Sequence, residues 1–147
     1  MKTIKLGELT TITIGRTPYR SDASLWDTKK ETSNIWLSIA DLLKTEGKIV
    51  NSSKEFISDE AASTFAIVPK GTLLVSFKLT LGRLAFAGQD LRTNEAIAAL
   101  HNNENLVNNE YLFYYLQQFD WTGYAKADQK VKGLTLNKTK LYEIPVL

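Results

Sequence analysis

The chain has 147 residues, of which 44% are hydrophobic and 23% are charged, and its formal net charge is +2. This length corresponds to about one domain that buries its own core, and the absence of cysteine excludes disulfide frameworks and thiolate chemistry. No apolar run is long enough for a signal peptide or a membrane-spanning helix, so we expect a cytoplasmic protein with no membrane partner.

Basic residues gather toward the two ends of the chain. Residues 1–30 carry six basic and three acidic side chains, residues 121–147 carry five and two, and residues 31–120 carry seven and eleven. If the two ends meet in space, they form a basic patch that attracts a polyanion. The alternative is that these lysines are ordinary solvated surface.

The first half of the chain predicts short strands around a long loop. The expected elements are a strand at 10–15, a loop at 19–33, a strand at 34–39, a helical turn at 40–43, a short strand at 48–50 and a helix at 58–65. Ile12 and Ile14 lie on one face of the first strand, and Ser58 has the position of a helix cap. The loop is long enough to be functional. We expect Trp26 to pin it to the body and Trp36 to lie in the core.

The second half predicts longer strands and the best helix. The expected elements are a turn at 68–71, strands at 73–81, 84–87 and 95–100, a helix from 108 to 123, a helical turn after 137 and a strand at 142–147. The first of these strands is expected to face the core with Leu73, Val75, Phe77 and Leu79. Gly82 would then permit a bulge or bend that re-aims Arg83. The helix has an apolar stripe of Leu112, Tyr115, Leu116 and Phe119. Many short strands with a few short helices indicate a mixed α/β (α+β) fold in a single compact domain.

Residues for catalysis are scarce in this sequence. His101 is the only histidine, and the asparagines beside it indicate a loop or surface residue rather than a base or a metal ligand. Asp41 and Glu46, followed by Lys48, form the one nuclease-like fragment, but so short a pattern arises by chance and a solvated helix end explains it. We therefore expect no enzymatic activity, no cofactor and no metal.

Seven short pieces occur in one order along the chain. They are LGEL (6–9), GRTP (15–18), the Trp26 loop with NIWLSIADL (34–42), VPKGTLLVSFKLTLGRLAF (68–86), TNEAIAAL (93–100), EYLFYYL (110–116) and KGLTLNKTKLYEIPV (132–146). This series resembles the target recognition domain of a type I restriction–modification specificity subunit, and the resemblance covers nearly the whole chain.

The resemblance implies a sequence-specific module for double-stranded DNA with no chemistry of its own. Such a module directs a separate methyltransferase (modification) subunit and a restriction subunit to a half-site. We expect residues 1–147 to form one recognition domain without the family's spacer helix, so that a second recognition domain or a homodimer supplies the other half-site. The alternative is a partial or half specificity subunit that serves as a protein-interaction module for the methyltransferase subunit, without autonomous DNA readout.

DNA contacts are expected mainly in two irregular segments, 19–30 and 124–132, which we expect to lie side by side. Stretches shared by domains that read different sequences cannot discriminate bases, so the variable loops must do so. The expected DNA-binding residues are Arg16, Tyr19, Arg20, Lys29, Lys30, Lys78, Arg83, Lys126, Gln129, Lys130 and Lys132. Lys78 and Arg83 also have a structural alternative, in which they pair with acids such as Glu95.

Overall fold

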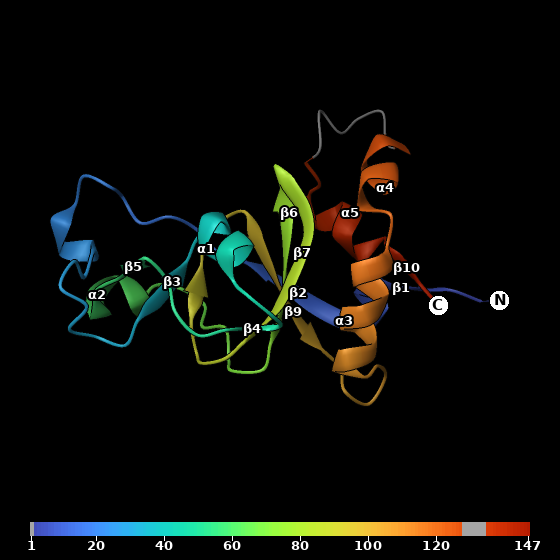
Figure 1. Cartoon of the computed structure of the whole chain (residues 1–147), viewed down its shortest axis with the longest axis horizontal. Helices are drawn as coiled ribbons and strands as arrows, with labels where there is room; N and C mark the ends of the chain where they lie inside the picture. The colour runs from blue at the N-terminus through green and yellow to red at the C-terminus, as the bar shows by residue number, and fades with distance from the viewer. Residues whose placement is uncertain (1, 128–134) are drawn as a thin grey trace.

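A five-stranded sheet forms the centre of the structure, which is a computed structural model that describes residues 2–127 and 135–147 (Figure 1). In spatial order its strands are β2 (Thr10–Ile14), β9 (Ile97–Asn102), β6 (Leu73–Lys78), β7 (Thr80–Ala87) and β4 (Ile49–Val50). Neighbouring strands are antiparallel, except that β4 runs parallel to β7. These strands confirm the predictions for 10–15, 48–50, 84–87 and 95–100 to within a few residues at their ends.

Two small sheets flank the central one. One contains β5 (Glu55–Phe56), β3 (Ile35–Leu37) and β8 (Arg92–Thr93), and the other pairs β1 (Ile4–Lys5) with β10 (Pro145–Val146). The β1–β10 pair is antiparallel, with Ile4 opposite Val146, so the two ends of the chain meet.

Five α-helices and two 3-10 turns complete the part of the fold that the structure describes. They are η1 (Leu6–Glu8), η2 (Ala23–Leu25), α1 (Ile39–Lys44), α2 (Asp59–Ala62), α3 (Asn109–Gln118), α4 (Trp121–Ala127) and α5 (Lys138–Tyr142). Side chains of Ser58 and Asn137 accept backbone N–H groups at the starts of α2 and α5, which confirms both predicted caps. Mixed sheets with short helices confirm the α+β prediction. None of the helices in the described ranges is long and apolar enough to cross a membrane.

The central sheet is buried on both faces. Leu73, Val75 and Phe77 of β6 contribute to one core cluster, together with Leu112 and Leu116 of α3, as predicted. The second cluster lies on the opposite face of the sheet, toward which Leu74 of β6 points. It contains buried residues from β3, α1 and β7. Full burial on both faces explains why β6 carries apolar residues in both registers.

The strand predicted over 73–81 is wrong at its end. The chain reverses at Leu79, which has φ of 65° and a side chain 78% exposed, and β7 already begins at Thr80. Gly82 lies inside β7 with φ of 81°, and the register between β6 and β7 shifts between Val75 and Phe77. A Cβ at Gly82 would stand 2.4 Å from the ring of Trp121, so this glycine allows α4 to approach the hairpin.

Three further predictions need correction. The helix predicted from 108 to 123 is two helices, because the Asp120 carboxylate accepts the N–H of Gly123 and starts α4 there. The final strand is limited to β10, since α5 extends to Tyr142. His101 lies in β9 rather than in a loop, half-buried, with its Nε2 2.8 Å from the hydroxyl of Thr13.

Candidate nucleic-acid interface

The segment 16–30 projects from the central sheet and is fastened by two tryptophans. The indole of Trp26 donates to the carbonyl of Tyr19 at 3.0 Å, and the indole of Trp36 donates to the carbonyl of Arg16 at 3.0 Å. The two rings meet edge to face, with centroids 5.3 Å apart. Trp36 is 1% exposed. These contacts confirm the structural roles predicted for both tryptophans, and they hold the loop in one shape.

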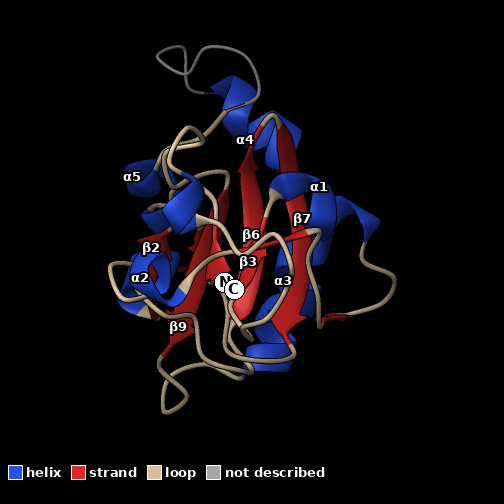
Figure 2. Cartoon of the chain, turned by 90° about the vertical axis from the view of Figure 1, so that its left-hand side faces the viewer, coloured by secondary structure: helices blue, strands red, loops and turns tan. Residues whose placement is uncertain are grey.

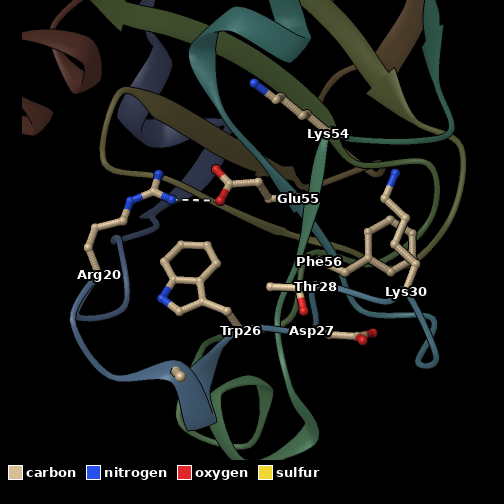
Figure 3. Close-up of a pocket in the computed structure, with 9 residues that line it drawn as sticks. Arg20, Trp26, Asp27, Thr28, Lys30, Lys54, Glu55 and Phe56 are labelled. Atoms are coloured by element: carbon tan, nitrogen blue, oxygen red, sulfur yellow. Dashed lines mark hydrogen bonds and ion pairs between the residues drawn. The ribbon is translucent and has the colours of Figure 1, made fainter.

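An open depression of about 660 Å³ lies between this loop and β5 (Figure 3). Its lining residues are Arg20, Ala23, Trp26, Asp27, Thr28, Lys30, Lys54, Glu55 and Phe56. The pairing of β5 with β3 places residues 54–56 beside the loop. The depression thus combines three cations, two aromatic rings and two carboxylates, a composition suited to a polar, anionic partner.

Arg20 is the best-defined side chain of the depression. One of its terminal nitrogens, Nη1, donates to the Glu55 carboxylate at 2.6 Å. Its guanidinium carbon lies 4.3 Å from the ring centre of Trp26 and 5.3 Å from that of Trp36. The Arg20 side chain is nevertheless 58% exposed. The guanidinium is therefore both oriented and accessible.

Lys30 and Asp27 shape the far side of the loop. Lys30 has φ of 53°, donates to the carbonyl of Ser53 at 3.1 Å and lies 5.1 Å from the ring centre of Phe56. The side-chain hydrogen bond from Thr32, helped by backbone N–H groups of Thr32 and Glu31, lowers the pKa of Asp27. The Asp27 carboxylate thus closes a turn, and the lowered pKa favours its ionised form.

The other predicted residues of this segment differ in their surroundings. Arg16 donates to the carbonyl and the hydroxyl of Thr64 and stacks 4.6 Å from the ring of Phe65, so it ties the loop to the end of α2. Tyr19 is 82% exposed, and Lys29 is exposed as well. Among the predicted DNA-binding residues of this segment, Tyr19 and Lys29 face solvent, and their side chains have no partner in the described part of the chain.

Lys78 and Arg83 lie on the β6–β7 hairpin, away from the depression. The guanidinium of Arg83 donates to the carbonyls of Thr45 at 2.6 Å and Gly47 at 3.3 Å, just after α1, and to that of Leu84. These contacts fit the structural alternative, but the expected partner was wrong, because Glu95 accepts the hydroxyl of Thr17 instead. Lys78 lies 5.4 Å from the ring of Phe77, near the hairpin turn.

The two basic segments do not lie side by side, as far as the described residues show. Segment 19–30 lies at one end of the longest axis of the molecule and α4 near the other (Figure 1), and the view from the first end also separates them (Figure 2). Trp121 and Ala125 anchor α4 on the helical face of the central sheet. Lys126 is exposed at the end of α4, and Gln129, Lys130 and Lys132 lie outside the described residues.

The nuclease-like fragment has a structural explanation. The carboxylate of Asp41 accepts the N–H and the hydroxyl of Ser38 and the N–H of Lys54, so it caps α1 and fixes β5. Glu46 is exposed. Within residues 2–127 and 135–147, no three histidine, cysteine, aspartate or glutamate residues gather to hold a metal ion.

Sequence reasoning missed the β5 side of the depression. Lys54, Glu55 and Phe56 follow the serines of an ordinary polar stretch, about 25 to 35 positions from the loop they face. No local signal marks them. Only the pairing of β5 with β3 brings them to the loop, and a two-residue strand is too short to give a periodic pattern.

In the described residues, an α+β body thus displays a cationic, aromatic loop beside an open depression. The sequence matches the family described as type I restriction modification DNA specificity domain over residues 1–146, so the chain belongs to this family. This confirms the resemblance drawn from the sequence.

Individual relatives support the same assignment. The chain is 25% identical to the type I restriction enzyme MjaIX specificity subunit of Methanocaldococcus jannaschii over 114 residues, which are 72% of this chain and 26% of that protein. Its fold is similar to the HsdS subunit from Thermoanaerobacter tengcongensis, with a TM-score of 0.71 at 17% identity, covering 99% of this chain and 32% of that one. A chain from a study of assembly and conformational transition of a type I system gives 0.74 at 17% identity, covering 99% and 33%. The chain thus spans about a quarter to a third of these relatives.

Proposed function

We propose that this domain binds double-stranded DNA and reads one half of a split target for a type I restriction–modification system. The observation that carries the proposal is the family match over residues 1–146, joined to an accessible depression that combines three cations with two aromatic rings. In this proposal the domain performs no chemistry. A modification subunit and a restriction subunit act in the cytoplasm on the DNA that it positions, and a second recognition domain or a second copy reads the other half.

The charges of the depression favour DNA backbone contacts at its rim. Arg20 pairs with Glu55, whereas Asp27 keeps its negative charge, which the Thr32 hydroxyl and backbone N–H groups stabilise. Lys30 and Lys54 add two further cations, so the lining holds three cations against two carboxylates. Contacts of lysines with phosphates supply affinity and orientation without sequence preference.

The test is binding of the purified chain to a pool of random duplexes of about 30 base pairs. At about 50 mM salt we expect a Kd tighter than the micromolar to submillimolar range typical of non-specific complexes at physiological salt, with a steep loss of affinity as salt rises. Fluorescence anisotropy of a labelled duplex measures both. No binding to any duplex at low salt would contradict the proposal.

One observation favours the interaction-module alternative. The outer face of α3 exposes Tyr111 and Tyr114, which are 47% and 45% exposed, and Ile49 and Leu106 are more than half exposed. Apolar rings at a surface are common in protein interfaces. A pull-down with a modification subunit, carried out with and without DNA, separates this alternative from DNA binding, because an interaction module would capture the subunit and yet retain no duplex.

A further inference from the structure

We propose that Arg20 is the residue of this domain that reads guanine in the major groove, and that Glu55 and Trp26 position it for this task. This inference rests on the proposed DNA-binding function and names the base chemistry of the same site. It follows from the donors of the guanidinium, from its charge partner and from the ring beneath it (Figure 3).

The guanidinium has one edge free. Nη1 of Arg20 donates to Glu55, whereas Nε and Nη2 donate to no group in the described part of the chain. These two N–H groups point in the same direction from one edge of the planar guanidinium. Guanine presents two acceptors, O6 and N7, on its major-groove edge, whereas adenine presents one acceptor and one donor there. A free two-donor edge therefore matches guanine.

The charge partner disfavours a phosphate at the same position. A phosphate bound to the free edge of Arg20 would place its negative charge within a few ångströms of the Glu55 carboxylate, which is 2.6 Å from the guanidinium. Like charges at such short range repel. A guanine edge carries only partial charges and avoids this cost, so the ion pair selects a base over the backbone.

The ring of Trp26 fixes the plane of the guanidinium. The guanidinium carbon lies 4.3 Å from the ring centre of Trp26, and Trp26 is itself held by its hydrogen bond to the Tyr19 carbonyl. A long side chain that is ordered before binding loses less conformational entropy on binding. Arg20 thus presents its edge in one orientation, while its 58% exposure leaves the edge open to a ligand.

The experiment is selection of bound sequences from a random duplex pool, carried out with the wild-type chain and with Arg20→Gln. The wild type should enrich a motif with one position that is always guanine. Arg20→Gln should lose the preference at that position alone, with affinity for the wild-type motif reduced roughly 5- to 150-fold. Lys54→Gln is the matched control, because it also removes one cation from the depression, and it should weaken binding without changing the motif.

Glu55→Gln tests the positioning role. Loss of the carboxylate should weaken the guanine preference and at the same time raise the affinity for random DNA, since Arg20 can then bind phosphate. A carboxylate that only stabilises the fold would produce neither change. Thermal melting of each variant shows that it is folded before selection.

Each outcome distinguishes the inference from the proposed function. If Arg20→Gln weakens all sequences equally and leaves the motif unchanged, Arg20 is a phosphate contact, and the inference fails while DNA binding stands. The same holds if the motif contains no guanine that depends on Arg20. If the wild-type chain binds no duplex, both the inference and the proposed function fail.

Discussion

Three arginines of this domain differ in the acceptors to which their guanidinium N–H groups donate. Arg83 gives its guanidinium donors to backbone carbonyls, Arg16 gives them to Thr64, and Arg20 makes one ion pair and keeps an edge free. The carbonyls of Thr45 and Leu84 are part-buried, and a buried polar group that loses its partner destabilises the fold. Donor use therefore distinguishes Arg16 and Arg83, which hold the fold, from Arg20, which keeps an edge free for a ligand.

Arg83→Ala should lower the free energy of unfolding by about 1–3 kcal/mol, because the carbonyls after α1 lose their donor. Arg20→Gln should change it by less than about 0.5 kcal/mol, since the Arg20–Glu55 pair is largely exposed. Urea denaturation measures both values. Equal losses for the two variants would contradict the division of roles.

His101 should make the fold sensitive to mild acid. Burial lowers the pKa of His101, so the unfolded chain takes up the proton at a higher pH than the folded chain does. The free energy of unfolding should then fall as the pH drops from about 7 to 5, through the unfolded pKa. The lowered pKa of Asp27 acts in a separate window, below about pH 4.

His101→Gln removes the titration and keeps an amide that can bond with Thr13. Chemical denaturation at pH 7 and pH 5 should show a smaller loss of stability for this variant than for the wild type. An identical loss in both proteins would mean that other groups cause the pH dependence.

At the scale of elements, the β6–β7 hairpin is joined to α4 through Gly82. Both φ of 81° and the ring of Trp121 bar a side chain at this position. Gly71 is the matched control, because it also has positive φ, at 91°, but nothing lies within 4 Å of its missing Cβ. Gly71→Ala should cost about 1 kcal/mol and Gly82→Ala at least 2 kcal/mol more, from strain plus overlap. Thermal melting compares them.

Leu79 is a second unusual position of the hairpin. Its φ of 65° is costly for a leucine, and its exposed side chain gains nothing from burial. Leu79→Gly should leave the free energy of unfolding unchanged or raise it by up to about 1 kcal/mol. Thr80→Gly, next to it on β7, should lower the free energy by about 0.5–1 kcal/mol. A loss for Leu79→Gly equal to that for Thr80→Gly would mean that the turn is unstrained.

Elements were predictable where a local rule governs them. Alternation identified β2 and β6, and hydroxyl or amide caps identified the starts of α2 and α5. The hairpin turn was missed because the apolar alternation continues through Leu79 and no turn residue marks the reversal. The break between α3 and α4 was missed because Asp120 starts the second helix, whereas Gly123 resembles a stop signal.

At the scale of the whole molecule, charge along the chain did not predict charge in space. The termini do meet, through the β1–β10 pair. Segment 16–30, however, leaves β2 and packs on the β3 sheet, at the opposite end from α4 (Figure 1). The net charge of a segment does not indicate to which end of the molecule the chain carries that segment. The depression likewise needed β5, whose position depends on pairing with a distant strand.

The separation of the two basic ends allows a direct test of which end faces DNA. Lys54→Gln and Lys138→Gln each reduce the formal net charge by one, but Lys54 lies in the depression and Lys138 lies on α5 near the other end. Only a lysine that contacts phosphate contributes to counterion release. Lys54→Gln should therefore reduce the slope of log Kd against log salt by about 1, and Lys138→Gln should leave it unchanged. Fluorescence anisotropy between about 50 and 200 mM salt measures the slopes. The reverse result would place the DNA at the end of the molecule where the termini pair, and would remove the depression from the interface.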